Sequence, residues 1–231
     1  MFKRILKFTN ISSTQDVARR FVQKGEEIAV CAYRQKRGRG RHTRIWFSPV
    51  GGLYLSLLLF PRTRQSSIPL LASLVVVKVL EDHDFSGLAI QWPNDILLNN
   101  RKVCGVLCEE YNRAVICGIG LNVNVGKFPE KLEMATSMKL ETGKQYDLEQ
   151  ILDEIINRFE PLYKKLQVRG FIKSEILKYI TGIGEPVELM TSRKKYCGTV
   201  FGIDDDWALL LRDENGLVKK FYYGDVKRLR W

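Results

Sequence analysis

The hydrophobic period of this chain changes twice, and each change limits the folds that it can adopt. Over residues 27–125 the apolar residues form short runs typical of strands, with one apolar helical segment at 68–79. Over residues 147–180 they recur at the spacing of amphipathic helices. After Gly184, short apolar segments alternate with turn signals such as DDD and ENG. The pattern predicts a sheet with helices, followed by a small all-β module.

The first part predicts an α+β domain whose mixed or antiparallel sheet carries helices on one face. Ser13 and Thr14 can cap a short helix that Gly25 closes. We expect a further helix at 171–180, and one at 148–166 that is kinked or broken near Pro161. The strands are expected at 27–35, 52–60, 88–92, 95–111 with a tight turn at Asn99 and Asn100, and 113–125.

The last part predicts a small β-barrel. Its strands are expected at 185–191, 195–203, 207–213, 217–223 and 224–231. We therefore predict two domains, with a boundary between residues 182 and 183: a larger domain over 1–182 and a smaller one over 183–231.

The charge of the chain favours a negatively charged partner. Its 37 basic and 26 acidic residues give a net charge of +11, which suits nucleic acid, a phosphorylated metabolite or an acidic protein surface. The longest apolar stretch, 68–77, is interrupted by Pro69 and is shorter than the ~18 residues that cross a bilayer. The start, MFKRILKFTN, lacks the apolar core of a secretory signal. We expect a cytoplasmic protein without a membrane partner.

The five cysteines argue against a disulfide framework, because their number is odd and they lie in apolar runs typical of buried reduced thiols. Cys104 and Cys108 have the spacing of a metal pair on paper. On a strand, however, residues four apart are separated by ~13 Å, which one ion cannot bridge. His42 and His83 are the only histidines, so a zinc site is not expected.

The segment 36–50, KRGRGRHTRIWFSPV, predicts an exposed basic loop. The glycines at 38 and 40 let backbone approach a ligand, and Arg39 and Arg41 offer paired donors to a carboxylate or phosphate. A lid over a ligand, a tether for nucleic acid and a solvated loop all fit this composition. The segment matches neither GxGxxG nor the phosphate-binding P-loop.

Other residues have a structural and a functional interpretation each. Trp46 is interpreted either as a ring that stacks on a ligand or as part of the core. Lys102 is interpreted either as an ammonium group in a cleft or as a surface lysine. Glycines inside strands mark a bulge or close approach of a ligand. The remaining candidates are polar side chains at turns, helix starts and strand ends. The glycines and these polar residues are Gly105, Gly118, Gly120, Asn94, Asp95, Ser13, Thr14, Gln15 and Gln35.

Six blocks of the chain, taken together and in order, resemble the biotin protein ligases. They are SSTQ, QKRGRGRHTRIWFSP, GGLYLSLLL, QWPNDILL, RKVCGVLCE and GIGLNVN. The last part, with EPVELM and GTVFGIDDDWALLLRDENG, is similar to the family's SH3-like domain. The blocks begin at Ser13, so we expect no DNA-binding domain before them, no repressor role and no nucleic-acid partner.

The resemblance implies a class II synthetase-like catalytic domain and a two-step reaction. Biotin and ATP, the two substrates, give biotinyl-5′-AMP, and a lysine of a biotin carboxyl carrier protein then accepts the biotin. Mg²⁺ is implied with ATP, without assigned protein ligands. The expected partners are the carrier protein and a second copy of the chain in a homodimer.

The resemblance also implies a role for each matching residue. Lys102, Arg41 and Arg39 are the expected catalytic residues, and Gln15 stands where asparagine is more frequent. Gln91 replaces the common lysine or arginine before WPND, which removes one possible phosphate contact on the pyrophosphate side. The expected biotin-binding residues are Ser13, Thr14, Gln15, Gln35, Gly38, Arg39, Gly40, Arg41, Lys102, Gly105 and Gly118. The expected ATP-binding residues are Arg44, Trp46, Asn94, Asp95 and Asn122.

Two alternatives to this function follow from the sequence. Lipoate ligation uses similar adenylate chemistry in a related fold, although without this RGRGRH arrangement. A basic nucleic-acid-binding module is favoured by the net charge and by the arginine loop.

Overall fold

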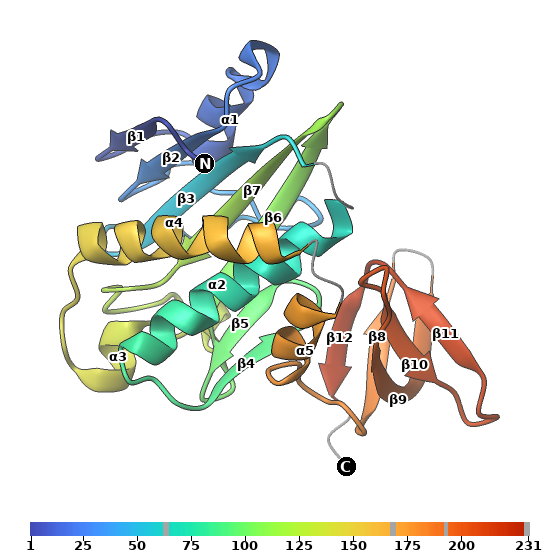
Figure 1. Cartoon of the computed structure of the whole chain (residues 1–231). Helices are drawn as coiled ribbons and strands as arrows, with labels where there is room; N and C mark the ends of the chain where they lie inside the picture. The colour runs from blue at the N-terminus through green and yellow to red at the C-terminus, as the bar shows by residue number, and fades with distance from the viewer. Residues whose placement is uncertain (62–64, 167–169, 192–193, 229–231) are drawn as a thin grey trace.

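The computed structural model describes residues 1–61, 65–166, 170–191 and 194–228. A mixed sheet of seven strands forms its larger part, in the order β1-β2-β3-β7-β6-β5-β4 (Figure 1). β1 pairs with β2 in parallel, and the other neighbours pair antiparallel. The strands are β1 (Ile5–Phe8), β2 (Ile28–Ala32), β3 (Leu53–Leu59), β4 (Leu88–Gln91), β5 (Asp95–Leu98), β6 (Arg101–Tyr111) and β7 (Ala114–Leu121).

Both faces of β2, β3 and β7 are largely buried, with helices on each side of these strands. Val115, Cys117, Ile119 and Leu121 of β7 face the main core, whereas Ala114 and Ile116 face a smaller one. This alternation follows the two-residue period of a strand. Because both faces are buried, the apolar runs are nearly continuous in the sequence. The alternation leaves Gly118 and Gly120 of β7 on the face of the smaller core.

Three helices cover the main face: α2 (Ile68–Asp82), α4 (Leu148–Lys165) and α5 (Phe171–Leu177). Figure 1 shows α2 and α4 crossing the sheet side by side. The short α1 (Thr14–Arg19) packs on the other face through Ala18, beside Val17 and Phe21. The α+β fold with a mixed sheet is confirmed, and α1 is the helix that departs from the expected single face.

The predicted turn between β5 and β6 is confirmed. Asn99 and Asn100 have φ angles of 50° and 62°, the left-handed pair that a two-residue primed turn requires. Of the predicted kink or break near Pro161, the break is wrong, because α4 continues through the proline to Lys165, and the kink stays a prediction. The buried residues Ile155 and Phe159 of α4 hold this face on the core next to the proline, so packing compensates for the lost N–H donor.

Four short elements were not anticipated: β1, whose residues are exposed or half-buried, α3 (Met138–Thr142), and 3-10 turns at Gln65–Ser67 and Glu130–Leu132. The predicted helix that Gly25 closes is divided into α1 and a 3-10 turn at Val22–Lys24, after which Gly25 is left-handed. None of the described helices has the length and apolar character needed to span a bilayer.

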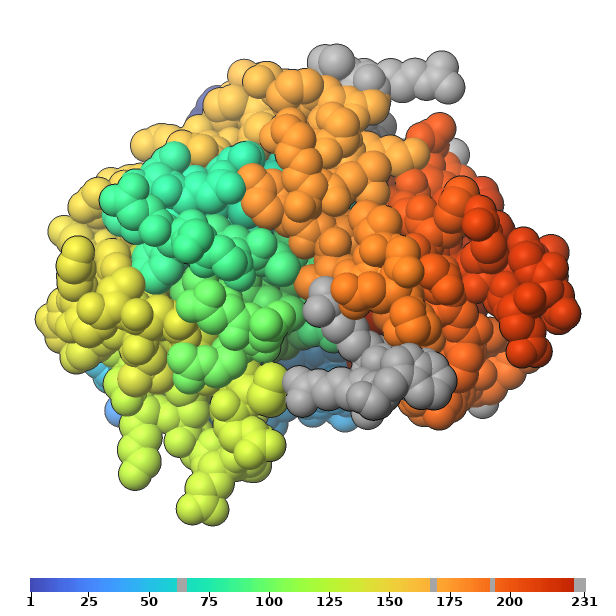
Figure 2. Space-filling model, turned by 90° about the horizontal axis from the view of Figure 1, so that it is seen from below, coloured from blue at the N-terminus to red at the C-terminus, as the bar shows by residue number. Residues whose placement is uncertain are grey.

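A second, antiparallel sheet of five strands forms the C-terminal part, in the order β11-β10-β9-β8-β12. The last three residues of the predicted final strand lie outside the described residues. Buried residues continue from the first sheet through Ile180 to Val187 of the second, and the predicted boundary between 182 and 183 stays a prediction. Figure 2 shows the segment before β8, in orange, between α2 and the C-terminal strands. The strands are β8 (Pro186–Met190), β9 (Lys195–Ile203), β10 (Leu209–Arg212), β11 (Val218–Phe221) and β12 (Asp225–Arg228).

The cysteines are free thiols, as expected. Burial raises the pKa of Cys31 to about 12, and Cys104 is also fully buried. Cys108 lies opposite Cys117 on the neighbouring strand. The expectation of burial is wrong for Cys197, which is exposed in β9. Within the described ranges no three His, Cys, Asp or Glu side chains gather as a metal site would need.

Candidate active site

A cavity lies on the face of the sheet opposite α2, and one row of paired residues forms its floor. Tyr54 of β3 is opposite Gly120 of β7, Gly120 is opposite Gly105 of β6, and Gly105 is opposite Asp95 of β5. The two central glycines leave room above the backbone, and the indole of Trp46 fills part of it. A Cβ at Gly120 would lie 2.4 Å from Trp46 Nε1, and one at Gly105 would lie 2.9 Å from its ring carbon Cζ3.

The next row of the sheet forms a polar end of the cavity. Ser56 of β3 is opposite Gly118 of β7, and its hydroxyl donates to Thr14 Oγ1 at 2.7 Å. The backbone N–H and hydroxyl of Thr14 both donate to Gln35 Oε1, at 2.8 and 3.1 Å. A Cβ at Gly118 would lie 3.1 Å from the amide carbon of Gln15. Neutral donors and acceptors from three distant segments therefore meet at this end.

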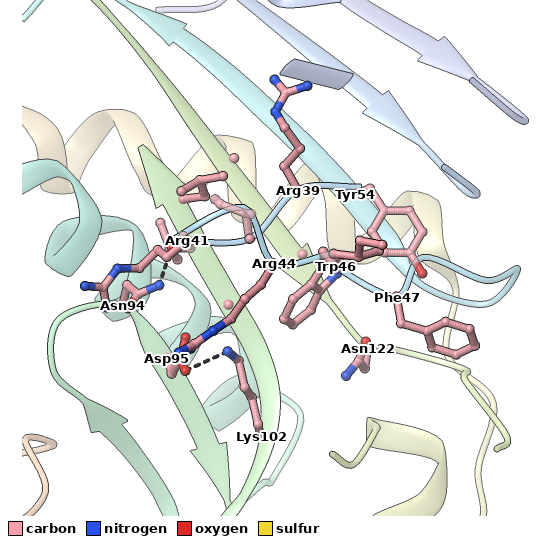
Figure 3. Close-up of a pocket in the computed structure, with 18 of the residues that line it drawn as sticks. Arg39, Arg41, Arg44, Trp46, Phe47, Tyr54, Asn94, Asp95, Lys102 and Asn122 are labelled. Carbon is pink, nitrogen blue, oxygen red and sulfur yellow. Dashed lines mark hydrogen bonds and ion pairs between the residues drawn. The ribbon is translucent and has the colours of Figure 1, made fainter. Parts of the chain in front are cut away.

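Positive charge gathers at the opposite end. Lys102 Nζ lies 2.6 Å from Asp95 Oδ2 and 5.2 Å from the centre of the Trp46 ring. Its backbone is fixed from both sides, since its N–H donates to Met134 O at 2.7 Å and its carbonyl accepts from Thr136 N at 2.9 Å. Arg41 Nη1 donates to Asn94 Oδ1 at 3.1 Å. Figure 3 shows both contacts beside Trp46.

The basic loop folds back over this end as a small hairpin. Gly40 N donates to Arg44 O at 2.7 Å, and the tip residues His42 and Thr43 have φ angles of 52° and 61°. Arg44 Nη2 lies 2.8 Å from a carboxylate oxygen of Asp225, in β12. Burial lowers the pKa of Arg41, and the negative charges of Asp225 and Asp95 oppose this shift.

Arg39 differs from the other arginines of the loop. Its guanidinium lies 2.7 Å from Asp16 Oδ1 and 3.1 Å from Glu109 Oε2, and Figure 3 shows it pointing away from Lys102. Its side chain therefore ties the loop to α1 and β6.

Three buried polar atoms of the cavity have no hydrogen-bond partner among the described residues. They are Trp46 Nε1, Asn122 Oδ1 and Asp95 Oδ1. The amide nitrogen of Asn122, by contrast, donates to Thr136 O at 3.0 Å. Because an unpaired buried polar group costs free energy, these atoms are ready contacts for a polar ligand. Trp46 Nε1 needs an acceptor, Asn122 Oδ1 needs a donor, and Asp95 Oδ1 needs a donor or a cation.

The cavity brings most of the predicted site residues together, from segments up to 108 positions apart between Thr14 and Asn122. Two do not line it. Ser13 is buried as the first residue before α1, and a Cβ at Gly38 would lie 2.6 Å from Trp46 O, so Gly38 closes the base of the loop. The predicted residues that line the cavity are Thr14, Gln15, Gln35, Arg39, Gly40, Arg41, Arg44, Trp46, Asn94, Asp95, Lys102, Gly105, Gly118 and Asn122.

Several further lining residues were not predicted as binding residues, among them Phe47, Tyr54, Phe128 and Asp225. The aromatic ones stand in or beside apolar runs, where a ligand-facing ring has the same signal as a core ring. Asp225 had no signal, because its relation to the loop is purely spatial. Gln91 lies outside the lining, and its amide nitrogen donates to Val226 O at 2.6 Å.

Two family models match this chain. The Biotin/lipoate A/B protein ligase family matches residues 7–125, and the Biotin protein ligase C terminal domain matches residues 182–228.

Several relatives and solved structures are similar over most of the chain. It is 36% identical to the bifunctional ligase/repressor BirA of Bacillus spizizenii, covering 94% of this chain and 71% of that protein. It is 34% identical to the biotin–[acetyl-CoA-carboxylase] ligase of Paracoccus denitrificans, covering 81% and 85%. The structure is similar to that of the biotin protein ligase from Aquifex aeolicus in complex with biotin and ATP, with a TM-score of 0.88, 32% identity and 100% of both chains covered.

Proposed function

This chain belongs to the biotin protein ligases of the biotin/lipoate A/B protein ligase family, and we propose how its residues perform the reaction. In the first step a biotin carboxylate oxygen attacks the α-phosphorus of ATP, the bond to the β-phosphate oxygen breaks, and pyrophosphate leaves. In the second step the amine of a carrier-protein lysine attacks the acyl carbon of biotinyl-5′-AMP. AMP leaves and the amine loses a proton. The observation that carries the proposal is one cavity with a neutral polar end and a cationic end.

The polar end receives the ureido ring of biotin. Thr14, Gln15 and Gln35 supply neutral donors and acceptors, each worth on the order of 1 kcal/mol net. Gly118 has no side chain to fill the space beside Gln15. The acyl chain can therefore run along β7 and β6 toward Gly105 and Lys102.

The cationic end brings the two reacting anions together. The biotin carboxylate and the α-phosphate repel each other, and this repulsion must be offset before attack. Lys102 has a fixed backbone, and Arg41 is held by Asn94. Both cations are therefore positioned in advance and need little reorganisation as charge develops. Catalysis by this site is mainly positioning and charge stabilisation.

The nucleotide binds over the middle of the floor. Trp46 stacks on adenine, and the unpaired Oδ1 of Asn122 accepts a hydrogen bond from the nucleotide. Arg44 and Asn94 lie on the phosphate side. Arg39, paired with Asp16 and Glu109, anchors the loop that carries Arg41.

The cavity also suits the Mg²⁺ that accompanies ATP. Mg²⁺ is commonly held by one or two carboxylates together with phosphates and water, and Asp95 has one unpaired buried oxygen. Asp95 would hold the ion, which supplies charge neutralisation for the phosphates when bound.

The charge pairing of the loop argues against the nucleic-acid alternative. Arg39, Arg41 and Arg44 all bind carboxylates, so they are not a free basic tether. We therefore propose that the excess positive charge of the chain serves to bind ATP and an acidic carrier domain. The homodimer and the cytoplasmic location stay predictions.

Transfer of radiolabelled biotin or lipoate to a carrier protein tests this function. We expect ATP-dependent labelling with biotin and at most trace labelling with lipoate, together with pyrophosphate release. Preferred transfer of lipoate, or salt-sensitive binding to DNA or RNA without any turnover, would refute the assignment.

A further inference from the structure

Two arginines of the loop bind one carboxylate of the C-terminal sheet. Arg41 Nη1 lies 3.2 Å from Asp225 Oδ1, and Arg44 Nη2 lies 2.8 Å from Asp225 Oδ2. Arg41 Nη2 also donates to the carbonyl of Gly224 at 3.1 Å. The start of β12 thus presents a carboxylate and a carbonyl to the arginine that we place at the reacting anions.

The position of Asp225 is fixed independently of the loop. β12 pairs with β8, with Asp225 opposite Met190. Gln91, at the end of β4, donates to Val226 O and so ties β12 to the larger sheet. Gly224 has a φ of 149°, and a Cβ there would lie 2.9 Å from Leu189 Cδ2, so its carbonyl is presented by a backbone that requires glycine.

Burial indicates which of the two contacts matters more. The side chain of Arg44 is 66% exposed, so its pair with Asp225 is weak and screened by salt. The side chain of Arg41 is 19% exposed and that of Asp225 30%. Their hydrogen bond is partly shielded from water and is therefore the stronger of the two.

Arg41 can bind Asp225 and a substrate anion at the same time. A guanidinium has five N–H donors, and Arg41 uses three contacts on Asn94, Asp225 and Gly224. The remaining donors stay available for the biotin carboxylate or the phosphate. Asp225 therefore holds Arg41 in place without occupying all of its N–H donors.

We infer that Asp225 is a positioning residue of the ligase: it holds Arg41, and with it the loop, over the activated biotin. The inference rests on the proposed function of Arg41. Through this contact the C-terminal sheet acts on the chemistry of the larger sheet. Loss of the carboxylate should weaken the hold on the adenylate more than it slows the formation of the adenylate.

The test compares Asp225→Asn with Asp213→Asn in the full chain, with biotin and ATP as substrates. Asp213 is a matched control, because it lies in the turn between β10 and β11 of the same domain and pairs with the exposed Lys219. We expect preformed biotinyl-5′-AMP to escape about tenfold faster from Asp225→Asn, the lower range for a hydrogen bond to a charged group. Its kcat for pyrophosphate release should fall by a smaller factor than the escape rate rises, and Asp213→Asn should behave like the unmutated chain.

A second measurement separates positioning from general destabilisation. In a background with Arg41→Ala and Arg44→Ala, the further change Asp225→Asn should leave adenylate escape unchanged. Asp225→Glu should restore most of the retention in the unmutated background. An unchanged escape rate in Asp225→Asn would overturn the inference, and so would an equal acceleration in the background without the two arginines.

Failure of the inference and failure of the proposed function give different results. If the unmutated chain releases no pyrophosphate with biotin and ATP, the proposed function is wrong. If it does, and Asp225→Asn retains the adenylate equally well, only the role of Asp225 is wrong.

Discussion

The ammonium of Lys102 lies 2.6 Å from the carboxylate of Asp95, at the cationic end of the cavity. The two residues come from neighbouring strands, β6 and β5, with a register shift between them. Asp95 thereby orients the lysine, and it keeps one oxygen unpaired for a further contact.

Replacing Lys102 with alanine should reduce adenylate formation at least about tenfold, or ~1.4 kcal/mol in the barrier. The reason is that the repulsion between carboxylate and phosphate would no longer be offset by a fixed cation. Pyrophosphate release in the presence of biotin measures the effect. Lys36→Ala serves as the control, because Lys36 is an exposed lysine at the start of the loop and outside the cavity lining. Near-normal release from Lys102→Ala would remove the lysine from the mechanism.

Replacing Arg41 with glycine should loosen the retention of biotinyl-5′-AMP, because one charged contact of the loop is lost. The rate at which the intermediate appears in solution during single turnover reports this directly. Arg37→Gly is the matched variant, since Arg37 is exposed and outside the cavity lining. Equal rates of escape from the two variants would contradict the role of Arg41.

Gly118→Ala should raise the KM for biotin and leave the KM for ATP nearly unchanged. The added Cβ would lie 3.1 Å from the amide carbon of Gln15, so that side chain must shift at the end that receives the ureido ring. Gly126→Ala is the control, because a Cβ there meets nothing within 4 Å. A parallel rise in both KM values would indicate a general distortion of the sheet instead.

Glu141 in α3 should stabilise the fold in a pH-dependent manner. Burial raises the pKa of this carboxyl, but hydrogen bonds from Thr136 and Asn99 and the charge of Arg101 outweigh it, so the net shift is downward from 4.5. A lowered pKa means that the stabilisation is present above pH 4.5 and is lost as the pH falls through the folded-state value.

Glu141→Gln should therefore lower the free energy of unfolding by about 1–2 kcal/mol at pH 7, with a smaller difference below pH 4.5. Urea unfolding at several pH values measures this, and the exposed Glu133→Gln is the control. A difference that stays constant from pH 7 to pH 3 would exclude the ionised carboxylate as the cause.

The parts of the fold that the sequence predicted are those with a strong local signal. Asn99 and Asn100 specify a turn through their tolerance of positive φ, and α2 has a long apolar run. β1 and α3 are short, and β1 is half-exposed, so neither has a period long enough to recognise. Pro161 was misleading because the packing of Ile155 and Phe159 outweighs a local propensity.

The candidate site was predicted largely through the resemblance of six sequence blocks. Residues inside those blocks, such as Lys102 and Trp46, line the cavity as expected. Tyr54 was not singled out, because both faces of β3 are buried and its direction has no sequence signal. Asp225 lies 184 positions after Arg41 in a different sheet, so only the folded chain brings them together.

The central claim is that one cavity joins biotin to AMP and retains the product. Native mass spectrometry of the purified chain after incubation with biotin and ATP tests it most directly. The account predicts a protein species whose added mass corresponds to one biotinyl-5′-AMP, and its loss when the carrier protein is added. A chain that binds biotin and ATP only as separate, unreacted molecules would contradict the claim.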